Sequence, residues 1–205
     1  MADFEEALNE TLKNEGVYSY HPDDRGGETY MGIARRFHPG WKGWQVIDLI
    51  KKNQSSGWTE LDKKSIINRN LQDNEELQKH VKDFYYMEFW KPIRGDEILL
   101  QQIANKIFDL AVNVGIFPAV RFLQESLNML NRNQKDYPDI KVDGKFGKQT
   151  LSTLRRHLQL SQYTSYGTDL LKMISAFQAR YYIEIMRSHP EQRVFARGWM
   201  GRVWD

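Results

Sequence analysis

The sequence predicts a mainly α-helical protein with two lobes and a small β-hairpin near the N-terminus. Apolar residues recur at helical spacing along most of the 205 residues. Strand signal is confined to residues 17–33, with a weaker one at 140–146. Pro92 and Gly95 interrupt the helical pattern near the middle of the chain. We therefore expect lobes at 1–94 and 95–205, packed as one compact unit because their linker is too short for free tethering.

The first lobe opens with a short amphipathic helix that leads to an acidic residue. Phe4, Leu8, Thr11, Leu12 and Glu15 fall on one face at about 100° per residue. Burial among apolar neighbours and the negative end of the helix dipole both disfavour a charged Glu15, so we expect its pKa to be raised. Such a carboxylic acid could donate a proton near neutral pH. Gly16 is expected to end the helix.

A polar and aromatic hairpin is expected after this acid. Asp24 precedes the tight turn Arg25-Gly26-Gly27, and Tyr30 and Ile33 are read as the return strand. A second carboxylate near Glu15 would suit cleavage of a glycosidic bond. The alternative is a partly exposed Glu15 at a helix end and a hairpin that only packs, and spacing alone leaves both open. The flat rings predicted to contact sugars belong to Tyr18, Tyr20 and Tyr30.

Motifs in this region resemble a known family. The run Glu15-Gly16-Val17-Tyr18, then Asp24-Arg25-Gly26-Gly27-Glu28-Thr29 and Gly32-Ile33, closely resembles glycoside hydrolase family 108. Its members are lysozyme-like N-acetylmuramidases, often phage endolysins or secretion activators. The resemblance implies a lysozyme-like fold with Glu15 as general acid, and it leaves the partner of Glu15 open. Val17 stands where the family usually has glycine, and a β-branched residue resists a positive φ.

The reaction implied by this resemblance is hydrolysis of the β-1,4 bond between N-acetylmuramic acid and N-acetylglucosamine in peptidoglycan. Glu15 would protonate the leaving oxygen, and Asp24 would orient a water or support the oxocarbenium-like charge. Thr29 would position a water. Glu28 would bind substrate or simply brace the hairpin. The distance between the carboxylates, which decides between inverting and retaining chemistry, is not given by the sequence.

Two rival interpretations come from other classes of protein. One is a non-catalytic wall-binding or secretion-assisting protein, which Val17 favours and the retained Glu15 opposes. The other is a purely structural helical interaction protein, which leaves the polar hairpin unexplained.

The rest of the first lobe is expected to be helical. Helices are predicted at 44–52, at 60–70 and from a cap at Asp73 or Asn74 up to Pro92. Trp44 and Trp90 are expected in the core. Trp41 and Trp58 lie beside glycines and are the candidates for a cleft wall.

The second lobe is predicted to contain five helices. They span 97–114, 117–131, 148–158 and 168–187, with a last one from Phe195 to Trp204. The first is apolar on nearly every side, except for a stripe of Lys106, Asp109 and Asn113. This stripe either touches water or forms an internal hydrogen-bond network, or else Asp109 and Asn113 hold saccharide hydroxyls or N-acetyl groups.

A second resemblance covers this lobe. It is carried by Phe108-Asp109-Leu110-Ala111-Val112-Asn113-Val114-Gly115, by Leu123-Gln124 and Leu127-Asn128, and by the run from Val142 to Thr150. These are similar to the predicted peptidoglycan-binding region that usually follows the muramidase segment. The resemblance implies glycan strands of peptidoglycan as partner.

Composition narrows the remaining possibilities. A net charge of +2 without a basic stripe gives no reason to expect nucleic acid. There are no cysteines and the five histidines lack ligand spacing, so we expect no metal and no cofactor. No run reaches the roughly 18 apolar residues of a membrane span, and the N-terminus lacks a signal-peptide core. We expect a monomer made in the cytoplasm, acting at the wall after holin- or secretion-system-type release.

Overall fold

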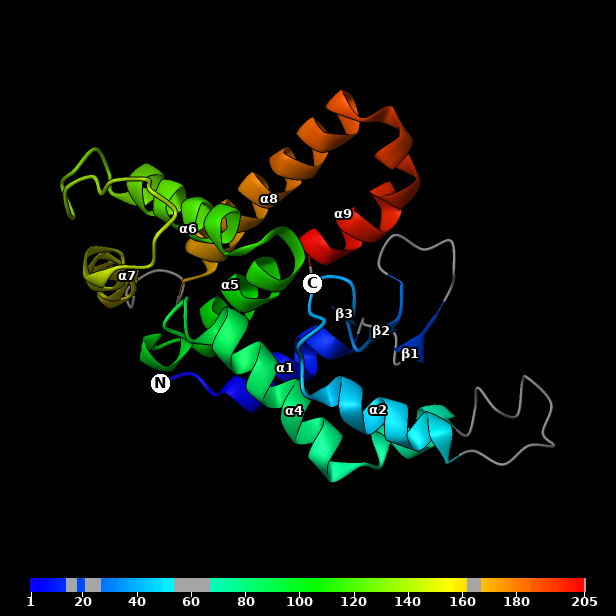
Figure 1. Ribbon diagram of the computed structural model, residues 1–205. Coiled ribbons are helices and arrows are strands. Elements are labelled where there is room, and N and C mark those ends of the chain that lie inside the picture. Colours follow the sequence, from blue (N-terminus) through cyan, green and yellow to red (C-terminus); the bar gives the residue numbers. More distant parts are fainter. Residues whose placement is uncertain (14–17, 21–26, 54–66, 162–166, 205) are drawn as a thin grey trace. The chain divides into compact units, whose positions relative to one another are not determined.

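A computed structural model of the chain describes residues 1–13, 18–20, 27–53, 67–161 and 167–204. Over these residues the chain is mainly helical with one small antiparallel sheet, as the sequence predicts (Figure 1). The described residues form two compact units. One comprises residues 4–88, and the other comprises residues 1–3 together with 89–205.

The 4–88 unit begins with α1, Phe4–Leu12. The apolar face predicted from the sequence is the buried one, since Leu8 and Thr11 are each 2% exposed. Glu5 at the start of α1 pairs with Lys82, and the ring of Phe4 meets Tyr86 edge-on at 5.2 Å. Glu15 lies beyond the last turn of α1, in a segment outside the described residues.

The sheet has three strands, where the sequence pattern predicts a two-stranded hairpin. The strands β1 (Tyr18–Ser19), β2 (Thr29–Tyr30) and β3 (Ile33–Ala34) are antiparallel in the order β1-β2-β3. The predicted return strand is divided by Met31 and Gly32, whose φ values are +45° and +79°. Positive φ at both central residues is the requirement of a tight two-residue turn. Ile33 therefore belongs to a strand of its own.

Helices complete this unit. They are α2 (Gly43–Lys52), a helical stretch at 67–72 and α4 (Glu75–Tyr85), followed by the π-helical turn η1 (Tyr86–Trp90). Asn74 caps α4, because its side-chain oxygen accepts a 2.8 Å hydrogen bond from the Leu77 amide. Trp44 is in the core, as predicted. Trp41 is half-buried, packs edge-on against Trp44 and donates its indole N–H to the His80 carbonyl. Trp58 lies outside the described residues.

The described part of the 89–205 unit consists of helices and the loops that join them, the longest of which spans 131–147. Its core elements are α5 (Gln101–Val114), α6 (Ile116–Leu130), α7 (Lys148–Ser161), α8 (Thr168–Ser188) and α9 (Ala196–Trp204). Short 3₁₀ turns precede α5 (η2, Gly95–Glu97) and link α8 to α9 (η3, Pro190–Phe195). α6 packs against α5, α7 and α8, and α9 folds back along α8 (Figure 1). Trp90 is fully buried, as predicted.

The strand predicted at 140–146 is absent from the described chain, and this prediction was wrong. The backbone there pairs with side-chain amides of α6. The Asn128 amide accepts from the Ile140 N–H at 2.9 Å and donates to the Ile140 carbonyl at 2.8 Å. These are the two bonds that a neighbouring strand would otherwise supply. The apolar alternation at 140–146 thus reflects a loop that lies on a helix.

Gln124, one turn before Asn128, holds the next part of this loop. It is 1% exposed and accepts from the Gly144 N–H at 2.9 Å. Its NH₂ group donates to the Asp143 carboxylate, the Lys145 carbonyl and the Thr150 hydroxyl at 3.0–3.1 Å. Gly144 has φ +68°, and a Cβ there would lie 2.3 Å from the Phe117 ring. The residues of the second sequence resemblance therefore define one loop and the helix that binds it.

We expect Gln124→Leu to destabilise this loop strongly. The substitution leaves the Gly144 N–H without its acceptor, at about 1–3 kcal/mol if this buried group finds no water. The Lys145 carbonyl loses one of its donors but still accepts from the Gly147 N–H at 2.9 Å. Hydrogen exchange followed by mass spectrometry should show faster exchange over residues 140–150. Gln149→Leu, at an exposed position of α7, is the matched control and should leave exchange unchanged. Equal exchange in the two variants would contradict a holding role for Gln124.

Candidate active site

A buried carboxylate lies at the centre of the small sheet. Glu28 directly precedes β2, and its side chain is 8% exposed. One carboxylate oxygen, Oε1, accepts from the Tyr18 hydroxyl at 2.8 Å and from Lys51 Nζ at 2.8 Å. The other oxygen, Oε2, lies 2.9 Å from Arg35 Nε. Both oxygens of Glu28 are therefore engaged by cations.

Each partner of Glu28 comes from a different element. Tyr18 is on β1, Arg35 directly follows β3, and Lys51 is in the last turn of α2. The strand register brings the first two to Glu28, and the Arg35 amide also donates to the Glu28 carbonyl at 2.8 Å. Three elements that are separate in sequence thus meet at one carboxylate.

Arg35 connects this centre to α2. Its guanidinium donates to both carboxylate oxygens of Asp48, at 2.7 and 3.1 Å, and lies 4.6 Å from the centre of the Trp44 ring. The planar guanidinium suits both contacts at once. We name the group of Tyr18, Glu28, Arg35, Asp48 and Lys51 the Glu28 cluster.

Several members of the Glu28 cluster have shifted pKa values. Burial lowers the pKa of Lys51, but its hydrogen bonds to Glu28 and Tyr18 outweigh burial and leave that pKa above its ordinary value. Burial, and then the bond to Glu28, raise the pKa of Tyr18. The hydrogen bond from Arg35 lowers the pKa of Asp48. Near neutral pH the lysine stays protonated and the phenol stays a donor, so the cluster can position neighbouring groups but is poorly suited to proton transfer.

The structure brings four of the predicted site residues together on the sheet and leaves two unplaced. Tyr18 pairs with Tyr30, and Thr29 lies on the central strand between Ser19 and Ala34. Thr29 is half-buried. The fourth residue is Glu28, all of whose described contacts are with protein groups. Tyr20, just after β1, is 63% exposed, whereas Glu15 and Asp24 lie outside the described residues.

Tyr30 is placed differently from the other tyrosines. It is 0% exposed, and its ring stacks on Trp41 at 6.4 Å. Its hydroxyl donates to the Leu71 carbonyl and accepts from the Gln78 amide. These contacts leave Tyr30 no surface that a saccharide could touch in this conformation.

The polar stripe of α5 lies in the 89–205 unit. The Asn113 amide donates to the carbonyl and the carboxylate of Asp109, at 2.7 and 3.0 Å. Asp109 also lies 3.8 Å from Arg202 of α9. Lys106 donates to the Arg202 and Val203 carbonyls at the end of α9, which is the internal network that the sequence left open for it. Asp109 and Asn113 keep some exposure, and their contact with saccharide stays a prediction.

Sequence reasoning missed Arg35, Lys51 and Gln78. A carboxylate on a buried strand needs cationic or hydrogen-bonding partners, so a signal for such residues was present. The sequence offers 29 lysines and arginines, however, and nothing in it selects two of them. Arg35 and Lys51 become the partners of Glu28 only through the strand register and the position of the end of α2 in the fold.

The described residues contain neither a cluster suited to a metal ion nor a helix suited to a membrane. Within the described ranges, no group of three histidine, aspartate or glutamate side chains is arranged to hold a metal ion. Among the helices that the structure describes, none combines the length and apolarity needed to cross a membrane.

Comparison with known proteins identifies the family. Residues 8–115 match the family described as glycosyl hydrolase 108, and residues 118–204 match a predicted peptidoglycan domain. No curated protein matches the chain. Among solved structures, SagA from Brucella abortus is similar, with a TM-score of 0.59 and 20% identity over 98% of this chain and 88% of that one. This likeness shows a shared fold. The glycosyl hydrolase 108 match covers more than half of the chain. The chain therefore belongs to glycoside hydrolase family 108 and is a glycosidase directed at peptidoglycan.

Proposed function

We propose that the chain hydrolyses the β-1,4 bond between N-acetylmuramic acid and N-acetylglucosamine of peptidoglycan. Glu15 acts as the general acid that protonates the leaving oxygen. Asp24 orients a water or supports the positive charge of the transition state, and Thr29 positions a water. Glu15, Asp24 and Thr29 all lie within residues 8–115, the range of the family match. We assign catalysis to residues 1–94 and wall binding to 95–205.

The contacts of the Glu28 carboxylate are the observation that favours Glu15 over Glu28 as the general acid. Its Oε1 already accepts hydrogen bonds from Lys51 and Tyr18, and its Oε2 forms an ion pair with Arg35. Because each oxygen is already in contact with a cation of the protein, neither is open to a leaving group, and Glu28 is poorly placed to act as the general acid. This supports Glu15 as the acid in preference to Glu28. Glu28 instead has a positioning role, because it holds the strands that carry Tyr18 and Thr29.

A second candidate function is glycan binding without cleavage. It is favoured by Val17, which stands two residues after Glu15 at a position where the family usually has glycine. A protein of that kind would bind the wall through the 118–204 region and release nothing from it.

Product analysis tests the proposal. Purified peptidoglycan is digested with the full chain, reduced with borohydride and analysed by mass spectrometry. A muramidase leaves N-acetylmuramic acid at the new reducing ends, so reduced muramitol should accumulate with time. Glucosaminitol would assign the other glycosidic bond, and a 1,6-anhydro end would replace hydrolysis by an intramolecular transfer. Undetectable release with intact binding would favour the non-catalytic candidate.

A further inference from the structure

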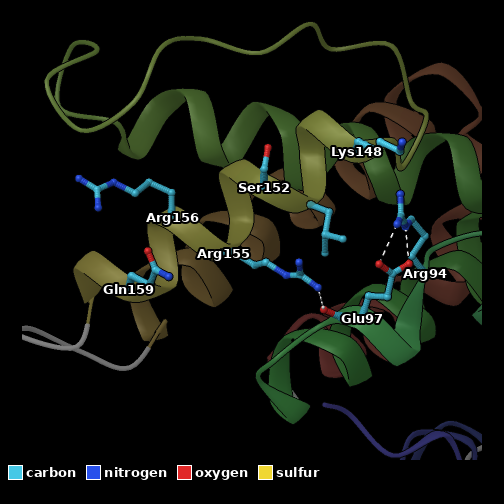
Figure 2. A pocket seen from close by; sticks show the side chains of 8 residues that line it. Arg94, Glu97, Lys148, Ser152, Arg155, Arg156 and Gln159 are labelled. Atoms are coloured by element: carbon cyan, nitrogen blue, oxygen red, sulfur yellow. Dashed lines mark hydrogen bonds and ion pairs between the residues drawn. The ribbon is translucent and has the colours of Figure 1, made fainter.

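A groove of about 370 Å³ lies between α7 and the segment that precedes α5 (Figure 2). Arg94 and Glu97 form one wall. Lys148, Ser152, Arg155 and Gln159 follow one another along α7 on the other wall, with Leu151 between them. Lys148 lies at the Arg94 end, and Arg156 and Gln159 lie at the opposite end (Figure 2). The volume is within the usual range for small-ligand sites.

The wall that carries Arg94 and Glu97 is rigidly built. The Trp90 ring lies so close to Gly95 that a Cβ there would be 2.2 Å from it, and the indole N–H donates to Asp96 at 2.8 Å. Arg94 holds a left-handed backbone conformation with φ +53°. Its guanidinium binds both carboxylate oxygens of Glu97, at 2.6 and 2.7 Å. The carboxylate of the groove is therefore occupied by a cation of its own wall.

The α7 wall carries cationic groups with spare binding capacity. Arg155 points across the groove and donates from Nη2 to the Glu97 carbonyl at 3.3 Å (Figure 2). Its Nε is buried and has no hydrogen-bond partner. Among the described residues, Lys148 forms no ion pair with a carboxylate closer than 4 Å. Arg156 forms none either, although its charge contributes to the lowered pKa of Asp136. Four cations thus face a groove whose one carboxylate is already bound by Arg94, and this excess of positive charge favours an anionic ligand.

We propose that this groove binds a carboxylate of the peptide stems of peptidoglycan. An arginine fork suits a carboxylate, and the Lys148 ammonium adds charge at one end. The apolar Leu151 and the polar Ser152 and Gln159 between the cations suit a short peptide better than a compact phosphate ion. The α7 wall lies within residues 118–204, which match a predicted peptidoglycan domain. The inference uses peptidoglycan as the substrate, but it depends on neither Glu15 nor the bond cleaved.

Titration with soluble peptides tests the site. The probes are the tripeptides L-alanyl-γ-D-glutamyl-L-lysine and its meso-diaminopimelate counterpart, each with free carboxylates or as carboxamides. Binding to the full chain is measured by calorimetry or by NMR. We expect the free acids to bind, the carboxamides to bind at least roughly ten-fold more weakly, and Arg155→Gln to weaken the free acids by a similar factor. Lys172→Gln, which removes one exposed cation of α8, is the matched control and should leave binding unchanged.

Further variants and ligands make the outcome decisive. Arg155→Lys keeps the charge but loses the fork, so it should recover only part of the affinity. If Arg155→Gln lowers the melting temperature, the exposed Lys148→Gln variant takes its place and should also weaken binding. Equal affinity for free acid and carboxamide would overturn the proposal, as would unchanged binding in both groove variants. Inorganic phosphate competing as well as peptide would overturn it in favour of a general anion site. Release of reducing sugar from peptide-free glycan by the native chain reports catalysis separately, so failure of this site and failure of the proposed reaction can be told apart.

Discussion

Glu15→Gln is expected to lower the rate of peptidoglycan hydrolysis by about 10²–10⁴-fold, the usual contribution of a general acid. Glutamine has nearly the same shape as glutamate, but its amide cannot give a proton to the leaving oxygen. The loss should therefore appear in the rate of reducing-sugar release at saturating substrate. Binding of the variant to intact sacculi, measured by co-sedimentation, should be unchanged.

A matched carboxylate controls for nonspecific effects of this substitution. Glu75 lies exposed in the first turn of α4, and Glu75→Gln removes the same charge from the same unit. Its activity should stay within about two-fold of the native chain, because exposed substitutions have small effects. If Glu15→Gln and Glu75→Gln were equally active, Glu15 would not be the acid. If the native chain itself released nothing, the non-catalytic candidate would replace the enzyme.

Glu28→Ala is expected to cost about 3 kcal/mol or more in unfolding free energy, because removing one member of a buried ion pair leaves charges without a partner. Arg35 and Lys51 are each about one-third exposed and can regain some water, which places the loss at the lower end of the usual range. Urea unfolding followed by tryptophan fluorescence should detect it. The Trp44 ring beside Arg35 is one of the six tryptophans that contribute to the signal.

Asp48→Asn separates this effect from a general loss of surface charge. Asp48 also binds Arg35, but its side chain is 53% exposed. Exposed ion pairs contribute about 0–1 kcal/mol, so the variant should unfold close to the native chain. A loss for Glu28→Ala as small as that for Asp48→Asn would mean that Glu28 does not hold the sheet together. The loss of unfolding free energy for Glu28→Gln should lie between those for Glu28→Ala and Asp48→Asn, because the glutamine amide oxygen can still accept a hydrogen bond from Tyr18.

Long helices were the part of the fold most open to prediction. The cap at Asn74, the apolar face of α1 and the run that forms α8 are all visible as local patterns, because a helix satisfies its own backbone. The start of α5 was less accessible. The pattern places it at residue 97, but Leu100 is extended (φ −108°, ψ 118°) and the helix begins at Gln101. The apolar residues before Gln101 belong to a non-helical segment that is buried in the core, where Ile98 is 0% exposed.

Features that depend on distant partners were not predictable. Ile140 looks strand-like, yet its backbone partner is the Asn128 amide, twelve residues earlier. The third strand depends on Met31 accepting a positive φ, which sequence statistics disfavour for a non-glycine residue. In the site, the glutamate of the family motif was recognised, but its cations were not. Arg35 and Lys51 become partners only after three elements have assembled.

The Gln124 amide has a practical consequence for mapping how this chain recognises the wall. Gly144 and Lys145 are hydrogen-bonded to the buried Gln124 side chain of α6. Alanine substitutions in the Asp-Gly-Lys-Phe-Gly string at 143–147 would therefore weaken binding to peptidoglycan even if these residues never contacted a sugar. Weaker binding of such variants would reflect loss of the loop structure, and a binding site mapped from these data would be centred on the wrong residues. Scans should therefore be scored against exchange rates at 140–150 before any position is counted as part of the recognition surface.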